Sequence, residues 1–213
     1  KRIYDDDKGP NTGGMGAYSP APIFDDTLRD KTEKQIIKPI LDAMISEGHP
    51  YKGFLYLGLM VVDNKPHVIE FNVRLGDPEA QVVLPLYKNS LYDLILSSIN
   101  GNIEDINIDE NDEFAVTVVL AADGYPDKYN KGMHIKGLDK LQNELVFHAG
   151  TKYQDNQYIT YGGRVLNVVG IDRSLNKAID KAYRLIDIID FDQKYFRKDI
   201  GKKGFKYYKN EEQ

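Results

Sequence analysis

A carboxylate and an amide two residues apart are the first residues here with an evident chemical use. Glu70 and Asn72 lie in the apolar run VIEFNV. In a β-strand their side chains project from one face, about 6 to 7 Å apart, and Phe71 points the other way, into the core. Carboxylate and amide oxygens suit a hard cation such as Mg²⁺, which takes few protein ligands and keeps positions for substrate phosphates. The alternative for this pattern is a solvated strand edge.

Charged residues follow this run directly. Arg74, Asp77 and Glu79 crowd into RLGDPEAQ, where Gly76 and Pro78 fix an abrupt turn. The charges therefore gather where the chain leaves a sheet, as expected of a ligand site. A capped, ion-paired turn leading into a helix explains the same residues without a ligand.

A glycine-rich loop, predicted over residues 9–22, is suited to binding an anion. It lacks the sequence patterns of a P-loop and of a dinucleotide fold. Successive glycine N–H groups can nevertheless form a concave nest for a phosphate or carboxylate, with the Asn11 and Thr12 side chains adding polar contacts. The alternative is a connector that uses positive φ angles. The candidate substrate-binding residues are Asn11, Thr12, Gly13, Gly14, Met15 and Gly16.

Arg164 is a further candidate because Gly162 and Gly163 precede it and allow close backbone approach. A surface arginine on a β-bulge is the alternative. The histidines show no metal-ligand spacing and receive no catalytic role; they are His49, His67, His134 and His148.

Two helices and a hairpin are predicted around Glu70, Asn72 and the charged residues that follow them. Apolar periodicity predicts a helix over 26–47, with a kink or a late start at Pro39. The runs 53–62 and 66–73 flank turn residues and predict a β-hairpin. A second helix is predicted from Ser90, with Gly101 as its stop.

An acidic stretch over 102–113 separates this part from a β-rich one, and we place two domains at 1–103 and 104–213. A helix with apolar residues at i, i+3 and i+4 is predicted from Ser174 to Ile189. Short runs that predict a small antiparallel sheet span 115–121, 133–137, 144–150, 158–163 and 164–170.

Composition excludes several classes of protein. The 213 residues include 28 Lys and Arg, 33 Asp and Glu, and no cysteine, for a net charge of −5. Nucleic-acid binding is disfavoured, and disulfides and thiolate metal sites are excluded. No apolar run approaches the roughly 18 residues of a membrane span. Because Lys1 opens the sequence without a signal-peptide pattern, we expect a chain that begins inside a domain.

Several segments in one order resemble a known family. They are KRIYDDDKGPNTGGMGAYSPAP, GLMVV with HVIEFNVRLGDPEAQ, AADGYP, TYGGRVLNVVG and YFRKDIG. Together they resemble the phosphoribosylamine–glycine ligases, or glycinamide ribonucleotide synthetases, of the ATP-grasp superfamily. EFNVR alone is similar to many ATP-grasp enzymes, whereas GPNTGGMGAYSP joined to the GDPE turn is specific to this ligase.

The resemblance implies an α+β fold: the second half of an ATP-grasp domain, an antiparallel sheet with helices, followed by a small β-rich C-terminal domain with a helix. It implies an ATP-dependent ligase of purine biosynthesis that joins glycine to 5-phosphoribosylamine. Glu70 and Asn72 would be ligands of Mg²⁺ or Mn²⁺, and Arg74 and Asp77 the catalytic pair beside the transferred phosphoryl group and glycine. ATP would be a substrate, and the location cytoplasmic.

The resemblance also implies parts that this chain lacks: an N-terminal domain and the first half of the ATP-grasp, with its nucleotide-clamping lysines. The run GFLYLGLM offers no second carboxylate ligand. We therefore expect the chain alone to be inactive and to expose apolar residues that the missing half covers. The alternatives are another ATP-grasp carboxylate–amine ligase and a non-catalytic binding or assembly module.

Overall fold

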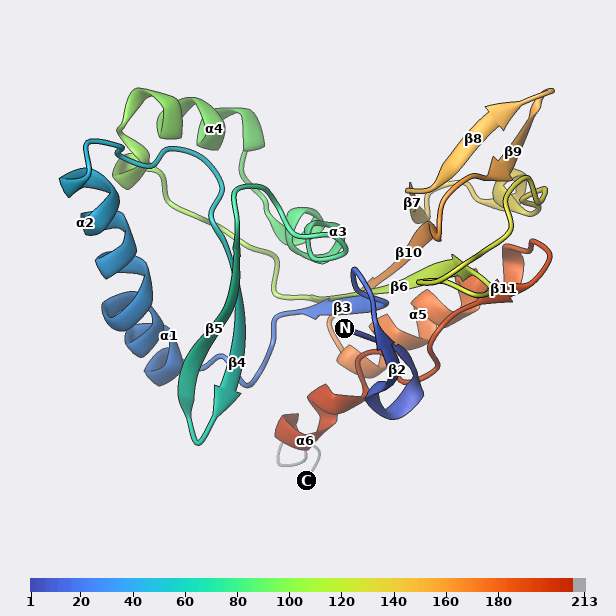
Figure 1. Cartoon of the computed structure of the whole chain (residues 1–213), viewed down its shortest axis with the longest axis horizontal. Helices are drawn as coiled ribbons and strands as arrows, with labels where there is room; N and C mark the ends of the chain where they lie inside the picture. The colour runs from blue at the N-terminus through green and yellow to red at the C-terminus, as the bar shows by residue number, and fades with distance from the viewer. Residues whose placement is uncertain (209–213) are drawn as a thin grey trace. The chain divides into compact units, whose positions relative to one another are not determined.

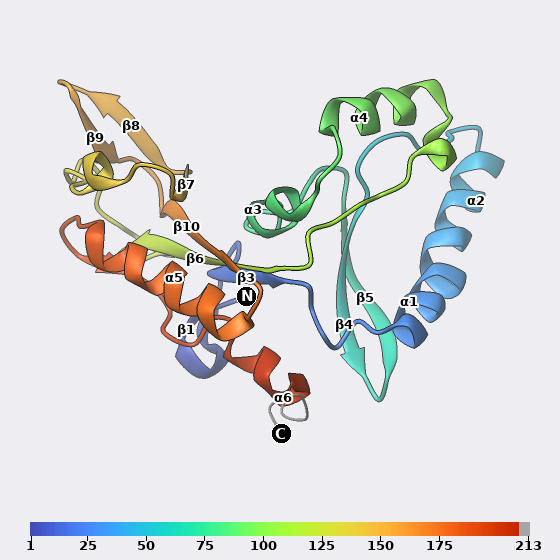
Figure 2. The same ribbon diagram turned by 180° about the vertical axis from the view of Figure 1, so that it is seen from behind.

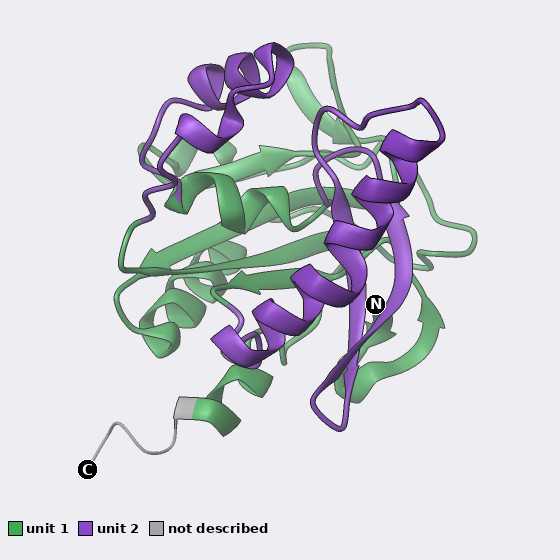
Figure 3. Ribbon diagram, turned by 90° about the vertical axis from the view of Figure 1, so that its left-hand side faces the viewer, with its two compact units in different colours: residues 1–20, 77–86, 111–213 green, residues 21–76, 87–110 purple. Residues whose placement is uncertain are grey.

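The computed structural model describes residues 1–208, and its α+β chain divides into two compact units (Figures 1 and 3). Unit 1 comprises Lys1–Pro20, Asp77–Leu86 and the described residues from Asn111 onward. Unit 2 comprises Ala21–Gly76 and Tyr87–Glu110. The units interleave along the chain and do not coincide with the division into residues 1–103 and 104–213, which stays a prediction.

A five-stranded antiparallel sheet forms the centre of unit 1. Its order is β11–β6–β10–β7, and β3 also pairs with β6. The strands are β3 (Gly16–Ser19), β6 (Phe114–Ala122), β7 (Leu145–His148), β10 (Arg164–Asp172) and β11 (Lys194–Tyr195). The predicted strands over 115–121, 144–150 and 164–170 are thus confirmed.

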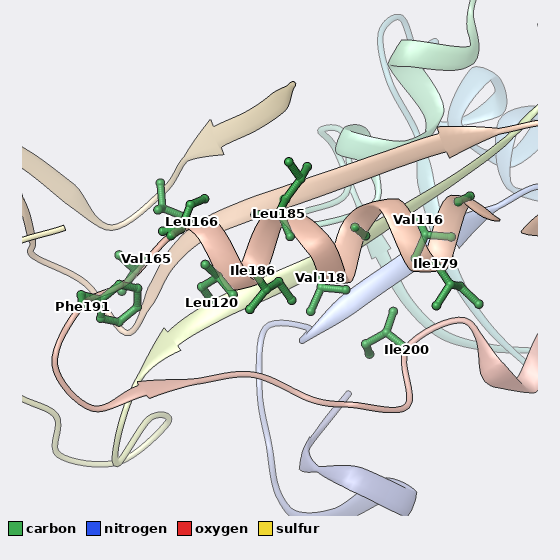
Figure 4. Packing of buried hydrophobic residues seen from close by; sticks show 14 of the residues in the cluster. Val116, Val118, Leu120, Val165, Leu166, Ile179, Leu185, Ile186, Phe191 and Ile200 are labelled. Atoms are coloured by element: carbon green, nitrogen blue, oxygen red, sulfur yellow. The ribbon is translucent and has the colours of Figure 1, made fainter. Parts of the chain in front are cut away.

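Both faces of this sheet are covered, which explains the apolar composition of its strands. Helix α5 (Leu175–Ile188), the predicted C-terminal helix, packs along β6 and β10 (Figure 2). Val116, Val118 and Leu120 of β6 face it in the main core cluster (Figure 4). Alternate residues of β6 point to the other face. They pack there against helix α3 (Ala80–Val83) and the buried side chains of Ile3 and Met15.

Smaller elements complete unit 1, and two of the expectations for it are wrong. Residues 9–22 are only partly loop, because they contain Gly16–Ser19 of β3 and the end of β2. Residues 133–137 form isolated bridges and no strand. The smaller strands are β1 (Arg2–Tyr4), β2 (Lys8–Asn11), β8 (Thr151–Gln154) and β9 (Gln157–Thr160). The short helices are η1 (Asp5–Asp7), η3 (Leu84–Leu86), η5 (Leu138–Lys140), η6 (Lys202–Gly204) and α6 (Phe205–Tyr208).

The long helix predicted in unit 2 is confirmed, with a wider turn in its middle. It consists of α1 (Asp26–Thr32), a π-helical turn η2 (Glu33–Ile37) and α2 (Lys38–Ser46). Pro39 follows the wide turn at the start of α2. Proline has no N–H to donate and its ring collides with the carbonyl four residues earlier. The π-helical turn accommodates both effects without breaking the helix.

The hairpin and the second helix of unit 2 also match the sequence prediction. Strands β4 (Tyr56–Val62) and β5 (Lys65–Asn72) pair antiparallel around a turn with positive φ at Asp63 and Asn64. Helix α4 (Leu91–Asn100) begins where the Ser90 hydroxyl accepts from the Asp93 N–H, and it ends at Gly101 in the left-handed region. The short η4 (Ile103–Asp105) follows. No helix among residues 1–208 has the length and apolar character needed to cross a bilayer.

Unit 2 buries little apolar surface. Among its residues, all of which the structure describes, Leu28 is the one fully buried large apolar side chain. The expectation that Phe71 points into the core is wrong, because it is 43% exposed. Ile69 of β5 and Val73, which directly follows β5, are 63% and 75% exposed. Apolar side chains are therefore exposed on β5 and directly after it, and their covering by the missing half stays a prediction.

A buried arginine, Arg197, joins Arg2 and Asp7 to Asp199 within unit 1. Arg197 is 6% exposed and donates to both carboxylate oxygens of Asp199, to the Asp7 carboxylate at 3.2 Å and to the Arg2 carbonyl at 3.1 Å. Asp199 also accepts the N–H of Asp6 at 2.9 Å. The hydrogen bonds from Arg197 hold the pKa of the Asp199 carboxyl at about 2. A buried charge costs free energy unless it is paired, and this network pairs it from two directions.

This network makes stability depend on pH in a predictable direction. The pKa of Asp199 lies below its ordinary value of 3.8, so its ionised form stabilises the fold above about pH 4 and the gain is lost as the pH falls toward 2. We expect Asp199→Asn to lower the free energy of unfolding by about 2 kcal/mol at pH 7. That cost should shrink between pH 5 and 2.

Urea unfolding of the 213-residue chain at several pH values measures this difference. Asp187→Asn, at an exposed position of α5, is the control and should leave the pH dependence unchanged. A cost of Asp199→Asn that stays constant from pH 7 to pH 2 contradicts the role of the ionised carboxylate.

Candidate functional site

Strand β5 places the predicted metal ligands on one face of the hairpin. Glu70 pairs with Gly58 of β4, and Asn72 pairs with Tyr56. Both side chains are half-buried, whereas Phe71 between them is exposed. A Cβ atom at Gly58 would lie 2.8 Å from Cγ of Glu70, so the Glu70 side chain lies across the space that glycine leaves. The sequence pattern was therefore right about the shared face, and Gly58 sets how Glu70 rests on it.

The donor set of this face fits a hard cation with few protein ligands. One carboxylate and one amide oxygen are oxygen donors of the type that Mg²⁺ binds. Among residues 1–208, no three or more His, Cys, Asp or Glu side chains lie in an arrangement that could hold a metal ion. The described part of the chain therefore has no cage built of carboxylates alone. A site with two protein ligands leaves the other positions to water and phosphate oxygens.

The predicted catalytic pair is divided between the two units. Arg74 follows β5 in unit 2, where its Nη1 donates to the Leu75 carbonyl at 2.9 Å. Asp77 begins the segment that belongs to unit 1. The structure thus places Arg74 beside the strand that carries Glu70 and Asn72, and it places Asp77 with the other candidate residues.

Arg164 brings three distant segments of unit 1 together. Its Nη2 donates to Asp77 Oδ2 at 3.0 Å, and its Nη1 donates to the Asp77 carbonyl at 2.8 Å and to the Gly14 carbonyl at 3.5 Å. A Cβ atom at Gly13 would lie 2.9 Å from the guanidinium carbon. A planar guanidinium can hold two acceptors at once, and here it joins the RLGDPEAQ turn to the glycine loop. Its role as a substrate ligand stays a prediction.

The glycine loop is held by hydrogen bonds that occupy two of its N–H groups. Gly13 N–H donates to the Tyr125 hydroxyl at 3.0 Å, and Gly14 N–H donates to the Thr12 hydroxyl at 3.0 Å. The Thr12 hydroxyl in turn donates to the Lys1 carbonyl at 2.8 Å. An anion that used these two N–H groups would have to replace both acceptors. The predicted nest is thus closed by the protein's own oxygens in this structure.

The other predicted loop residues lie in or beside regular structure. Met15 is 2% exposed and packs beneath the sheet, so its side chain anchors the loop. Gly16 pairs with Val118 as part of β3, and a Cβ atom there would lie 2.6 Å from the Thr117 carbonyl. Asn11 ends β2 and is exposed. Substrate binding by these residues remains a prediction.

Two residues in contact with this region were missed by sequence reasoning. Gln81 donates from its Nε2 to Asp77 Oδ1 at 3.2 Å. It lies four residues after Asp77, but Asp77 precedes helix α3, so the rule for side-chain pairs within one helix does not give this contact. The Tyr125 ring lies against Gly163, where a Cβ atom would be 2.1 Å from Cδ2. Nothing in the local sequence of AADGYP predicts its bond to Gly13.

Most of this chain is similar to known proteins. Residues 1–80 match the family described as "Phosphoribosylglycinamide synthetase, ATP-grasp (A) domain", and residues 115–203 match "Phosphoribosylglycinamide synthetase, C domain". A phosphoribosylamine–glycine ligase from Chlorobaculum tepidum is 45% identical over 96% of this chain and 49% of its own length. A trifunctional purine biosynthetic protein, adenosine-3, from Gallus gallus is 48% identical over 94% of this chain and 20% of its own length.

A solved structure gives the same relationship. The crystal structure of phosphoribosylamine–glycine ligase from Thermotoga maritima is 40% identical and superposes with a TM-score of 0.85, covering 93% of this chain and 49% of that one. This chain spans about half the length of the single-function relatives that it matches. Because two domains of one synthetase match in order over most of the sequence, the chain belongs to the phosphoribosylglycinamide synthetase family and carries residues of its ATP-grasp domain and its C domain.

Proposed function

We propose that this chain is part of an ATP-dependent ligase that joins glycine to 5-phosphoribosylamine, giving glycinamide ribonucleotide, ADP and phosphate. The observation that carries the proposal is the match of both synthetase domains, in order, to a chain whose Glu70 and Asn72 share one face of β5. That match disfavours the alternative that the chain is part of another ATP-grasp carboxylate–amine ligase. A non-catalytic assembly module is the remaining alternative.

The reaction needs an activated carboxylate. A glycine carboxylate oxygen attacks the γ-phosphorus of ATP, the bond to the bridging oxygen breaks, and ADP leaves with the electron pair. The amine of 5-phosphoribosylamine then attacks the carbonyl carbon of glycyl phosphate, the bond from that carbon to the phosphate oxygen breaks, and the amine loses a proton. Positioning and charge neutralisation govern phosphoryl transfer, so no Ser or Cys nucleophile is required.

The residues of this chain supply what those steps need. Glu70 and Asn72 would hold Mg²⁺ or Mn²⁺, which when bound neutralises phosphate charge. Arg74 follows the same strand and would donate to the transferred phosphoryl group. Asp77, whose orientation Arg164 fixes, would accept a hydrogen bond from the glycine ammonium. The glycine loop around Gly13 would bind substrate beside Asp77, where substrate oxygens would replace the Tyr125 and Thr12 hydroxyls that now accept from its N–H groups.

The metal assignment is tested in the whole ligase. The whole ligase is this chain together with the part that its relatives have and that this chain does not span. We expect Glu70→Gln and Asn72→Ala each to lower kcat/KM on the order of 100-fold at limiting Mg²⁺, because each removes an oxygen ligand or its charge. Excess Mg²⁺ should restore part of the loss. Glu47→Gln, at an exposed position after α2, is the control. A wild-type rate for either variant at limiting Mg²⁺ contradicts the assignment.

The role of Asp77 predicts a different kinetic pattern. Asp77→Asn keeps the shape of the side chain and removes its charge, so we expect the KM for glycine to rise at least roughly tenfold. The KM for ATP should stay nearly unchanged. Initial rates at varied glycine and varied ATP separate the two effects. Equal losses for both substrates would instead indicate that the turn has collapsed.

The chain by itself should not catalyse the reaction. An ATP-grasp enzyme holds its nucleotide between two subdomains, and this chain spans about half of its relatives. We expect calorimetry of the 213-residue chain to show no micromolar binding of Mg·ATP, and an ADP assay to show no glycine-dependent release. Measurable turnover by this chain would contradict the proposal that it is one part of the active enzyme.

A further inference from the structure

The carboxylate of Asp77 is held at both of its oxygens. Arg164 Nη2 donates to Oδ2 at 3.0 Å, and Gln81 Nε2 donates to Oδ1 at 3.2 Å. The three residues belong to unit 1, and the Asp77 side chain remains 46% exposed. The N–H groups of Val82 and Val83 both donate to the Glu79 carbonyl, so Gln81 lies in the first turn of α3, and Asp77 lies in the turn that precedes this helix. The carboxylate therefore has a fixed plane and an accessible edge.

The amide of Gln81 makes this contact in an unfavourable environment. Its Oε1 is buried and has no hydrogen-bond partner within the described residues 1–208. A buried acceptor without a partner is destabilising. Turning the amide over would relieve nothing, because it would place a carbonyl oxygen against Asp77 Oδ1, which is itself an acceptor. The Asp77 carboxylate thus dictates the orientation of Gln81.

An apolar side chain of similar length would suit the fold at least as well. It would remove the unpartnered acceptor and keep the packing volume. Position 81 nevertheless carries glutamine, and its side-chain amide donates to Asp77. The benefit of this residue therefore lies in the orientation of the Asp77 carboxylate and not in the stability of helix α3.

We propose that Gln81 is a positioning residue for Asp77 in the ligase reaction. Together with Arg164 it fixes the carboxylate so that its remaining lone pairs meet the ammonium group of the amino-acid substrate. This inference rests on the proposed function for the identity of that substrate. Removing a group that orients a metal-ligating side chain typically costs 10- to 100-fold, and we expect an effect at the lower end of that range for the substrate-binding carboxylate of Asp77.

The central variant is Gln81→Met, which removes the donor and the buried acceptor together. In the whole ligase, the KM for glycine should rise roughly tenfold while the KM for ATP is unchanged. In the 213-residue chain, the Tm should stay equal or rise, because an unpartnered buried acceptor has been removed. A glutamine with a merely structural role predicts the opposite, a lower Tm with an unchanged KM. Gln35→Met, at an exposed helical position, is the matched control.

A double-mutant cycle tests whether Gln81 acts through Asp77. If it does, Gln81→Met should have little further effect on the KM for glycine once Asp77→Ala has removed its partner. An effect of full size in the Asp77→Ala background overturns the proposal. So does a KM for glycine that matches the Gln35→Met control.

A measurement on the 213-residue chain separates this inference from the proposed function. The side-chain amide protons of Gln81 should exchange slowly with solvent in NMR spectra, and their resonances should shift in Asp77→Ala. If the Gln81 side-chain resonances do not shift in Asp77→Ala, the positioning role is overturned, whatever the activity of the whole ligase. Absence of glycine-dependent ADP formation by the unmodified whole ligase, by contrast, contradicts the proposed function and leaves the measured contact standing.

Discussion

Strand β6 is the constraint on which the rest of unit 1 depends. It is hydrogen-bonded along both edges, to β10 on one side and to β3 and β11 on the other. Its residues from Ala115 to Ala122 are all buried, so every side chain needs a covering partner. Helix α5 covers one face, and helix α3 with Met15 covers the other. The glycine loop and the turn after Asp77 are therefore held where they meet because both adjoin segments that cover the same strand.

Local patterns predicted most of the regular elements because those elements depend on neighbours in the sequence. Asp63 and Asn64 indicate the hairpin, and the Ser90 cap with Gly101 delimits α4. The errors arose where distant pairing overrides local composition. Gly16–Ser19 reads as loop and becomes a strand only because β6 provides its partner. Phe71 was expected in a core, but within this chain the apolar face of β5 has little that covers it.

The geometry of the candidate site was likewise predictable from the sequence only in part. The shared face of Glu70 and Asn72 follows from the two-residue period of a strand, so the sequence sufficed. The meeting of Arg164 with Asp77 depends on a fold that brings together residues 87 positions apart, and no spacing rule gives it. Tyr125 and Gly13 are 112 positions apart and were not linked by any motif. The resemblance correctly named the family, while the closing of the predicted anion nest by Thr12 and Tyr125 required atomic positions.

The buried Arg197 network has a consequence for how this polypeptide acquires its structure. The contact between Arg197 and Asp7 joins residues 190 positions apart, and strand β3 pairs with β6, about one hundred residues downstream. During synthesis on a ribosome, the aspartate-rich opening segment therefore emerges long before its arginine does. Contacts of such high order carry a large entropic cost of loop closure and slow folding. Until Arg197 has emerged, the Asp7 carboxylate cannot form its ion pair with this arginine, although the local pairing of β1 with β2 needs no later residue.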